Sequence, residues 1–472
     1  MKNLKEKHLE AVETSDFWKN RVDELIEKTK EDKSGACWQI NEVEEFAKRQ
    51  AEELDSLNTD QKNSMPFFGL SVGMKDLFCI QGVTTSAGSR MLETFKSPYD
   101  SQVWETLKKK GVLLGAKLAM DEFAMGSYSN TSYLGRTSIP GFSEHTAGGS
   151  SGGSGAALAA NLVDFTTGSD TGGSVRLPAS FCSLYGYKPT YGAFSRYGMI
   201  AYASSLDQAG LLTNSIEDLQ YLLESGISER DVRDMTCIGL TEVSGKIKDK
   251  IKIGFFPEFL ENETIDEETR VAYKKLIDDL KTKATLIPVS VKYMSNAAQV
   301  YYILATSEAS SNLARYQGVY TGNKLVDERF EGTYWEQCAQ YRSKYFGKEV
   351  QKRIMIGSYI LNAENYGVMY EKSINIRKAL KQSILDNLKT VDMMVLPTSP
   401  VTSPKWDEIN KMTSAQIYMS DYMTVPFSLA GVPVISVPYA KTKLGLGIGF
   451  QFVGSPFKDA QLMEDIKKVL KG

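Results

Sequence analysis

One stretch near the middle of the chain, residues 163–182, reads VDFTTGSDTGGSVRLPASFC. Its first part, Val163–Thr167, is a short run of apolar and β-branched residues, which is typical of a buried strand. A turn rich in glycine and serine follows, and Val175–Cys182 looks helical. A strand that leads through a tight turn into a helix is a unit from which α/β proteins are built. The stretch therefore predicts an α/β fold with a glycine-rich turn at the end of a strand.

The alternation of strand-like and helical segments continues on both sides of this stretch. Short apolar runs predict further strands at Phe68–Val72, Val112–Leu118, Ile251–Phe256, Ala284–Val289 and Val391–Leu396. Helices are expected at Ser101–Lys109, Ser154–Asn161, Ser215–Glu224, Glu267–Lys281 and Ile374–Leu388. Near the end, Val434–Tyr439 and Ile448–Val453 can pair as an antiparallel hairpin. The pattern predicts a central mixed, mostly parallel β-sheet covered by helices on both faces.

The chain divides into a short helical part and one large domain. Residues 1–60 are rich in charge, and their apolar residues have helical spacing, which predicts an N-terminal helical segment packed on the core. The serine- and glycine-only stretch 148–155 has the composition of a linker. It runs directly into Ala156–Ala160, however, which is a strong helix-forming run. We therefore expect residues 61–472 to form one compact domain.

The composition excludes several classes of protein. The 472 residues include 55 Lys and Arg against 58 Asp and Glu, a net charge of −3, so no general basic field can hold a nucleic acid. The five cysteines include no C-x-x-C pair, which argues against a zinc site or a disulfide framework. The sequence has no apolar run long enough to span a bilayer and no apolar leader. We expect a cytoplasmic protein, with an organellar matrix as the open alternative.

Only two histidines are present, His8 and His145. A Ser-His-Asp triad or a Cys-His pair needs at least one of them, and a site with two histidine ligands needs both. His8 lies in a charged segment that is expected to form an exposed helix. Residues 149–153 match the Gly-x-Ser-x-Gly elbow of α/β-hydrolases, but that fold needs a histidine after the serine. Any hydrolytic chemistry is therefore expected to proceed without imidazole and without a metal.

A serine and a lysine are candidates for that chemistry. Gly172 and Gly173 let the backbone turn consecutive N–H groups toward an oxyanion, and Ser174 follows at the expected start of a helix. The alternative is a structural turn with a capping serine. Lys75 follows an apolar run that begins at Phe67. It lies either at a solvated strand end or in a partly buried place, where burial can make its amine a neutral base.

Three segments in this order, GMKD at 73–76, GGSSGGS at 148–154 and GSDTGGSVRLPA at 168–179, closely resemble the amidase signature family. The resemblance extends from about residue 60 to the C-terminus, and it implies a triad of Ser, cis-Ser and Lys.

The family pattern implies a role for each matching residue. Ser174 matches the nucleophile that forms the acyl-enzyme, Ser150 matches the bridging serine with a cis peptide bond, and Lys75 matches the base. The oxyanion hole corresponds to the backbone of Thr171, Gly172, Gly173 and Ser174.

Further segments resemble the A-subunit of the glutamyl-tRNA(Gln)/aspartyl-tRNA(Asn) amidotransferases. They lie at 187–198, 204–208, 308–316, 347–355 and 426–433. In that family this subunit hydrolyses glutamine and passes ammonia to a partner, which activates Glu-tRNA(Gln) with ATP and converts it to Gln-tRNA(Gln). The resemblance implies a heterotrimer whose other members are a tRNA-binding kinase and a small protein, with contact to tRNA mainly through the partner. ATP and Mg²⁺ are expected in the partner, and no cofactor is expected in this chain. The preference for Glu-tRNA(Gln) or Asp-tRNA(Asn) stays open.

A glutamine pocket must bind an α-carboxylate and an α-ammonium group. Arg353 lies in a helical stretch that runs into apolar residues, so its guanidinium is expected to point partly inward and bind the carboxylate. Asp421 is a single acid among aromatic and thioether side chains and can meet the ammonium. Alternatively, these two residues pair with each other or with nearby charges. By resemblance the glutamine-binding set is Arg353, Asp421, Met125, Gly126 and Tyr302, with Tyr301 as an equal choice for the last.

Two other functions stay open at this point. A stand-alone amidase acting on small or aryl amides would need an apolar acyl channel in place of a charged pocket. A non-catalytic subunit is the third possibility, against which the joint presence of Lys75, Ser150 and Ser174 argues. The loop at 137–147 departs from the family pattern, so the sequence does not predict its conformation.

Overall fold

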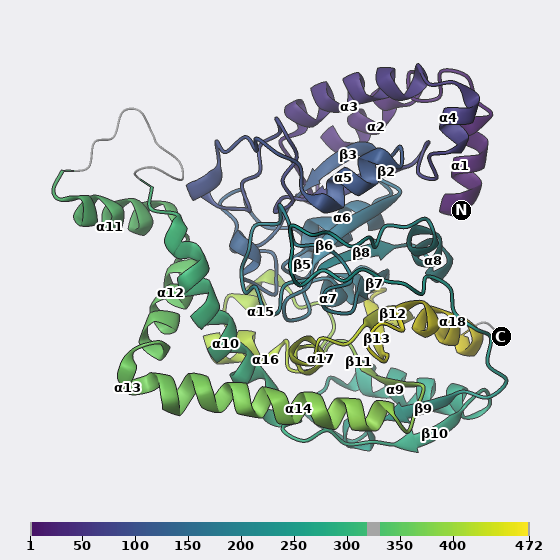
Figure 1. Cartoon of the computed structure of the whole chain (residues 1–472). Coiled ribbons are helices and arrows are strands. Elements are labelled where there is room, and N and C mark those ends of the chain that lie inside the picture. The colour runs from purple at the N-terminus through teal and green to yellow at the C-terminus, as the bar shows by residue number, and fades with distance from the viewer. Residues whose placement is uncertain (1, 319–330, 471–472) are drawn as a thin grey trace.

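The computed structural model describes residues 2–318 and 331–470, and a mixed sheet of eleven strands runs through this part of the chain (Figure 1). In order across the sheet the strands are β1 (Cys37–Trp38), β3 (Leu113–Leu118), β2 (Ser71–Lys75), β6 (Phe165–Ser169), β8 (Ala209–Thr213), β7 (Tyr185–Lys188), β12 (Val434–Lys441), β13 (Gly447–Val453), β11 (Met393–Pro397), β9 (Lys252–Phe255) and β10 (Thr285–Pro288). A separate hairpin contains β4 (Ser138–Ile139) and β5 (Phe142–Thr146), so the loop that departs from the family pattern is a two-stranded ribbon.

Parallel pairing occurs on both flanks of the large sheet. β2 is parallel to β3 and β6, and β9 is parallel to β10 and β11. From β6 to β11 each neighbouring pair is antiparallel, including the predicted hairpin β12–β13. The α/β class with a central mixed sheet is confirmed. Parallel pairs make up less of the sheet than the sequence predicts. For β12 and β13 the reason is their short connecting turn, since parallel neighbours need long crossovers.

Helices flank the sheet (Figure 1). The structure has α1 (Leu4–Val12), α2 (Val22–Lys30), α3 (Ile40–Asp55), α4 (Thr59–Asn63), α5 (Gln102–Lys109), α6 (Gly152–Ala159), α7 (Arg176–Phe181), α8 (Ile216–Glu224), α9 (Glu267–Lys281), α10 (Ala297–Asn312), α11 (Tyr334–Tyr345), α12 (Lys348–Ile360), α13 (Ala363–Asn365), α14 (Lys372–Leu388), α15 (Trp406–Ile409), α16 (Ser414–Met419), α17 (Val425–Ala430) and α18 (Asp459–Leu470). The five expected helices agree with α5, α6, α8, α9 and α14 to within two residues at each end. The first expected strand begins three residues late, at Ser71, and this shift places Lys75 at its end.

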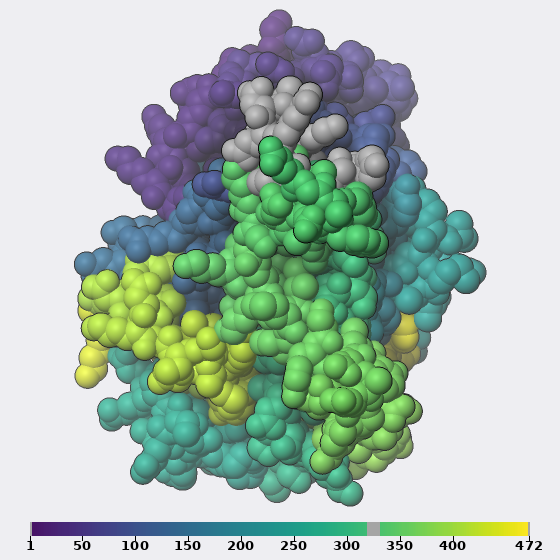
Figure 2. Space-filling view, turned by 90° about the vertical axis from the view of Figure 1, so that its left-hand side faces the viewer, coloured from purple at the N-terminus to yellow at the C-terminus, as the bar shows by residue number. Residues whose placement is uncertain are grey.

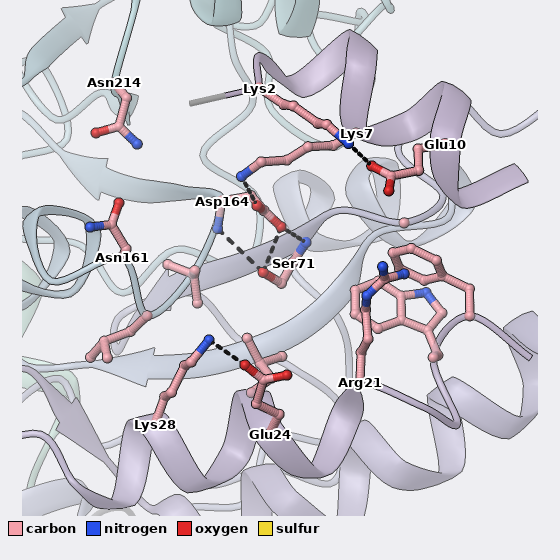
Figure 3. Close-up of a pocket in the computed structure, with 16 residues that line it drawn as sticks. Lys2, Lys7, Glu10, Arg21, Glu24, Lys28, Ser71, Asn161, Asp164 and Asn214 are labelled. Carbon is pink, nitrogen blue, oxygen red and sulfur yellow. Dashed lines mark hydrogen bonds and ion pairs between the residues drawn. The ribbon is translucent and has the colours of Figure 1, made fainter. Parts of the chain in front are cut away.

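The first four helices lie at one end of the molecule, purple in Figures 1 and 2. The buried apolar side chains of α1, α2 and α3 belong to the same hydrophobic cluster as those of β2 and β3. Lys7 of α1 forms an ion pair with Asp164, whose carboxylate also accepts hydrogen bonds from Ser71 (Figure 3). A cavity of about 530 Å³ lies between α1, α2 and the amino ends of β2 and β6. The division at residue 60 stays a prediction.

His8 corrects one expectation about this region. Its helix forms as expected, but the side chain is buried, and Nδ1 lies 3.0 Å from the carbonyl oxygen of Phe68, because α1 packs against the chain that leads into β2. The five cysteines are free thiols. Within the described residues, no helix combines the length and apolar character needed to cross a bilayer.

A second group of helices, α10, α12, α14 and α17, packs together, and α12 (green) lies on the side of the molecule that faces the viewer in Figure 2. Of these, α14 and the part of α12 around Arg353 are predicted from the sequence. In α10 the polar and apolar residues are mixed around the helix and do not form a continuous apolar stripe, so the sequence shows little helical periodicity there. This group carries Tyr302 on α10 and Arg353 on α12, and residue 421 lies just before α17.

Candidate active site

The site begins where two parallel strands end side by side. Lys75 is the last residue of β2, and Ser169 is the last residue of the neighbouring β6. The amine of Lys75 lies 2.8 Å from the hydroxyl oxygens of Ser150, Ser151 and Ser169. Within residues 2–318 and 331–470, the side-chain hydrogen bonds of this lysine go to three hydroxyl groups and not to a carboxylate.

The position of Lys75 decides between the two alternatives left by the sequence. The side chain is completely buried, so it is not a solvated strand end. Burial lowers the pKa of Lys75 to about 7, although the charges of Asp121, Asp170 and Asp207 oppose that shift. At neutral pH a large fraction of these amines is therefore unprotonated and able to accept a proton.

The glycine- and serine-only stretch is a buried turn and not a linker. The peptide bond between Gly149 and Ser150 is cis, as the resemblance implies. A Cβ on Gly149 would lie 2.2 Å from the carboxylate of Asp121, so no side chain fits there. The carbonyl of Ser150 accepts a hydrogen bond from the Asp121 amide at 3.2 Å, and α6 begins two residues later. The turn therefore delivers the Ser150 hydroxyl to Lys75.

Ser174 lies on the more accessible side of this cluster. It is 9% exposed, whereas Ser150 is fully buried. The carbonyl of Ser174 accepts a hydrogen bond from the Ser151 amide at 3.2 Å, which ties its turn to the serine-rich turn. In the described part of the chain its hydroxyl makes no hydrogen bond. The structure therefore joins Lys75 to Ser150 directly and places Ser174 beside them through the backbone.

The turn before Ser174 is crowded around its two glycines. Gly173 has φ +141°, and a Cβ there would lie 2.3 Å from Thr424 Oγ1, while one on Gly172 would lie 2.7 Å from the Tyr301 hydroxyl. Thr171 donates a hydrogen bond to Asp207 at 2.7 Å, which fixes the start of the turn. This close packing holds the backbone of the predicted oxyanion hole in one conformation.

A buried ion pair spans the same turn. Arg176 Nε and Nη2 donate to the two carboxylate oxygens of Asp170, each at 2.9 Å. Both side chains are fully buried. A bidentate pair of this kind has a defined geometry, so it fixes the position of the residues between its members.

Asp421 is one of the residues predicted to bind glutamine. One of its carboxylate oxygens accepts hydrogen bonds from Ser127 Oγ at 2.9 Å and from the Tyr302 hydroxyl at 3.2 Å. Burial raises the pKa of Asp421 to about 6, while the Ser127 hydrogen bond and the charge of Arg353 lower it. Met125 and Gly126 immediately precede Ser127, so the structure brings this loop to Asp421.

Arg353 is buried, as expected, but it already has an acidic partner. Its Nε donates to Glu349 Oε1 at 2.8 Å, one turn earlier on α12, and Nη1 donates to the Tyr202 hydroxyl at 2.8 Å. The aromatic rings of Tyr202, Tyr302 and Tyr418 lie 5.2–5.6 Å from the guanidinium carbon. The pairing with a nearby charge, considered as an alternative, is therefore present, with Glu349 as the partner.

Tyr302 connects the two ionic residues. Its hydroxyl contacts Asp421 and its ring lies next to Arg353. Tyr301 instead faces the turn at Gly172. The sequence could not choose between the two tyrosines. Tyr302 is the one in contact with both Arg353 and Asp421.

Several neighbours of these groups were not identified from the sequence. They are Ser151 and Ser169 beside Lys75, Ser127 beside Asp421, and Glu349, Tyr202 and Tyr418 beside Arg353. The position of Ser169 at a strand end and the four-residue spacing of Glu349 and Arg353 are signals that could have found two of them.

His145, the other histidine, lies away from this cluster in the β4–β5 ribbon. Its Nδ1 is 2.7 Å from the Ser403 carbonyl oxygen. At the end of the same ribbon, Thr146 donates a hydrogen bond to the carbonyl of Tyr128 and accepts one from the amide of Gly148. The ribbon therefore contacts the start of the serine-rich turn through the hydroxyl group of Thr146.

Comparisons with known proteins identify relatives of this chain. The Amidase family model matches residues 22–463. The A-subunit of a glutamyl-tRNA(Gln) amidotransferase from Acinetobacter baumannii is 38% identical over 431 residues, which cover 90% of this chain and 86% of the relative. The protein of the same name from Prochlorococcus marinus is 40% identical over 427 residues, with 89% and 87% coverage.

A solved structure gives the same result at the level of the fold. The crystal structure of the glutamyl-tRNA(Gln) amidotransferase A-subunit from Thermotoga maritima has a TM-score of 0.72 and 32% sequence identity, and the match covers 94% of this chain and 92% of that one. The region matched by the family model includes Lys75, Ser150 and Ser174. The chain belongs to the amidase family.

Proposed function

We propose that this protein is the glutamine-hydrolysing subunit of a tRNA-dependent amidotransferase, with Ser174, Ser150 and Lys75 as its catalytic triad. The observation that carries the proposal is the 2.8 Å contact between the Lys75 amine and the Ser150 hydroxyl, in a place where burial lowers the pKa of Lys75 to about 7. A neutral amine beside a hydroxyl can serve as the general base that two distant histidines do not supply.

The first half of the reaction forms a tetrahedral intermediate on Ser174. The hydroxyl oxygen of Ser174 attacks the side-chain carboxamide carbon of glutamine, while its proton passes to Ser150 and the proton of Ser150 passes to Lys75. The hydroxyl of Ser174 must turn toward Ser150 for this step. Backbone N–H groups in the turn from Thr171 to Ser174 stabilise the oxyanion.

The second half releases the products. The C–N bond of the tetrahedral intermediate breaks, Lys75 returns the proton through Ser150 to the departing nitrogen, and ammonia leaves the acyl-enzyme formed on Ser174. Water then attacks the ester on Ser174 and releases glutamate. In this proposal the ammonia passes to a partner subunit in the cytoplasm, which uses ATP and Mg²⁺ to convert Glu-tRNA(Gln) to Gln-tRNA(Gln). A small third subunit completes the complex.

Glutamine recognition follows from the second cluster. Arg353 and Asp421 carry opposite charges on the two sides of Tyr302. In the proposed complex the α-carboxylate of glutamine binds the guanidinium, and the α-ammonium binds the carboxylate. Met125 and Gly126 line the same pocket through the loop that leads to Ser127.

The proposal is tested by ammonia release from glutamine, measured with the chain alone and with its copurified partners. The control substrate is propionamide, a small amide that lacks both α-substituents. We expect glutamine to be hydrolysed with the much higher kcat/KM, because only glutamine has the α-carboxylate and α-ammonium groups that bind Arg353 and Asp421. Higher kcat/KM for propionamide would instead favour a stand-alone amidase.

A further inference from the structure

Glu122 is a buried carboxylate that the proposed reaction does not use. It is 2% exposed and begins the short 3₁₀ turn η2 (Glu122–Ala124), directly before Met125. Burial raises the pKa of Glu122 to about 7, while hydrogen bonds from Ser89 and Gly347 lower it. A carboxylate in such a place is costly unless it is well hydrogen-bonded.

The hydrogen bonds of Glu122 connect two segments that are far apart in the sequence. Ser89 Oγ donates to Oε1 at 2.5 Å. The backbone amide of Gly347 donates to Oε2 at 2.8 Å and to Oε1 at 3.1 Å. The carboxylate of the 122–127 segment thus binds the chain at the beginning of α12.

Gly347 is the N-cap residue of α12 and has no side chain with which to cap the helix. The Glu122 carboxylate instead accepts the N–H of Gly347 itself, as the glutamate of a capping box does, and when ionised it places a negative charge near the positive end of the helix dipole. A Cβ on Gly347 would lie 2.2 Å from Glu122 Oε2, so the contact requires glycine at this position.

The two segments joined in this way carry opposite halves of the proposed glutamine pocket. α12 carries Arg353, which lies six residues after the capped amide. The other segment continues from Glu122 through Met125 and Gly126 to Ser127, which donates a hydrogen bond to Asp421. The position of Arg353 relative to Asp421 therefore depends on the Glu122–Gly347 contact.

We infer that Glu122 is a positioning residue for glutamine binding, which holds the N-terminus of α12 against the 122–127 loop so that Arg353 and Asp421 are spaced for the two α-substituents. The inference rests on the proposed function. Glu122 touches none of the proposed reacting groups, so its effect is expected on substrate binding and not on the chemical step.

The test is a double-mutant cycle with Glu122→Gln and Gly347→Ala, measured on the complex as it is purified. Each single variant should raise the KM for glutamine about fivefold and change kcat less than about twofold, as expected for the loss of a charged helix cap. The double variant should raise KM little further, because both substitutions break the same contact. Ser89→Ala is the matched control, since it removes a hydrogen bond to the same carboxylate that does not reach α12, and its KM should stay within about twofold of wild type.

The outcomes separate this inference from the proposed function. If the wild-type complex does not hydrolyse glutamine, the proposed function fails. If it does, and the single variants lower kcat without raising KM, or their effects on KM multiply in the double variant, Glu122 has no positioning role. Should Glu122→Gln not fold, Gly347→Ala alone gives the decision, because it displaces the carboxylate without removing it. An unchanged KM in a folded Gly347→Ala variant would overturn the inference.

Discussion

Two lysines occupy equivalent places in the sheet but have different neighbours. Lys75 is the last residue of β2, and Lys188 is the last residue of β7. Both side chains are completely buried, and burial lowers the pKa of each to about 7. Lys75 contacts three serine hydroxyls, whereas Lys188 donates hydrogen bonds to the carbonyl oxygens of Pro189 and Val432 at 2.9 and 2.5 Å.

The difference shows that a lowered lysine pKa does not by itself identify a base. A hydroxyl group both accepts and donates a proton, so the contacts of Lys75 can form a path for proton transfer. A backbone carbonyl only accepts a hydrogen bond and has no proton to pass on. The neighbours, and not the pKa, therefore distinguish a proposed catalytic amine from a structural one.

The largest expected effect tests whether the proton path from Lys75 reaches Ser174. Ser174→Ala should lower kcat for glutamine by roughly 10⁴- to 10⁶-fold, because no other hydroxyl is in place to form the acyl-enzyme. Steady-state ammonia release gives the rate, and Ser151→Ala is the comparison, since Ser151 also contacts Lys75. Near-normal turnover of Ser174→Ala together with complete loss in Ser151→Ala would contradict the assignment.

The next prediction compares the effects on kcat of substituting each of the two lysines. Lys75→Met should lower kcat by about 10³- to 10⁴-fold through loss of the general base. Lys188→Met removes a buried amine of the same pKa, but folded protein should keep kcat within about tenfold of wild type, because no proton path includes it. Circular dichroism confirms folding of each variant. Equal losses in the two variants would remove the distinction.

Arg353 extends the comparison to a third buried cation, whose neighbours are aromatic rings and Glu349. Arginine keeps its charge, so Arg353 is expected to act in binding and not in proton transfer. Arg353→Ala should raise the KM for glutamine by about 30-fold or more, equivalent to roughly 2 kcal/mol or more of lost ionic binding.

The control for Arg353 is Arg377→Ala. Arg377 is partly buried, and its guanidinium donates to the Leu429 carbonyl and to Ser205, outside the proposed pocket. This variant should leave the KM for glutamine unchanged. If Arg353→Ala lowers hydrolysis of propionamide as much as that of glutamine, Arg353 has a structural role.

The pH dependence of the rate tests the protonation state of Lys75. Since its pKa is lowered to about 7, kcat/KM should reach a plateau above that pH and fall about tenfold per pH unit below it. A second decrease is expected below about pH 6, where Asp421 gains a proton and loses its charge. Lys188→Met should leave the profile unchanged. A flat profile between pH 6 and 8 would mean that Lys75 is not the base.

These comparisons also show what the sequence could predict. Lys75, Ser150 and Ser174 lie in local motifs, so their proximity follows once the strands are placed. The neighbours of Arg353 do not follow, because Tyr202 lies in the loop between β7 and β8 and Tyr418 lies on α16, and both reach Arg353 only through tertiary packing. No local pattern specifies how such distant segments meet, and the burial of His8 was missed for the same reason.

The smallest expected effect concerns stability and should be equal for the two lysines. The pKa of a lysine is about 7 in the folded protein for both Lys75 and Lys188, against an ordinary value of 10.5. Between these pH values the unfolded chain binds one more proton per lysine, so the free energy of unfolding should rise with pH. The rise is about 1.4 kcal/mol per pH unit for each lysine, and the effect is absent below pH 7, where both states are protonated.

Urea titrations at pH 8 and 9 give the free energy of unfolding at each pH. The increase in this free energy per pH unit should be about 1.4 kcal/mol smaller in Lys75→Met and in Lys188→Met than in wild type. If only Lys188→Met lowers the pH dependence of the free energy of unfolding, the serine hydroxyls keep Lys75 protonated in the folded protein. The hydroxyl cluster would then not provide a neutral base, and the basis for distinguishing the two lysines would be lost.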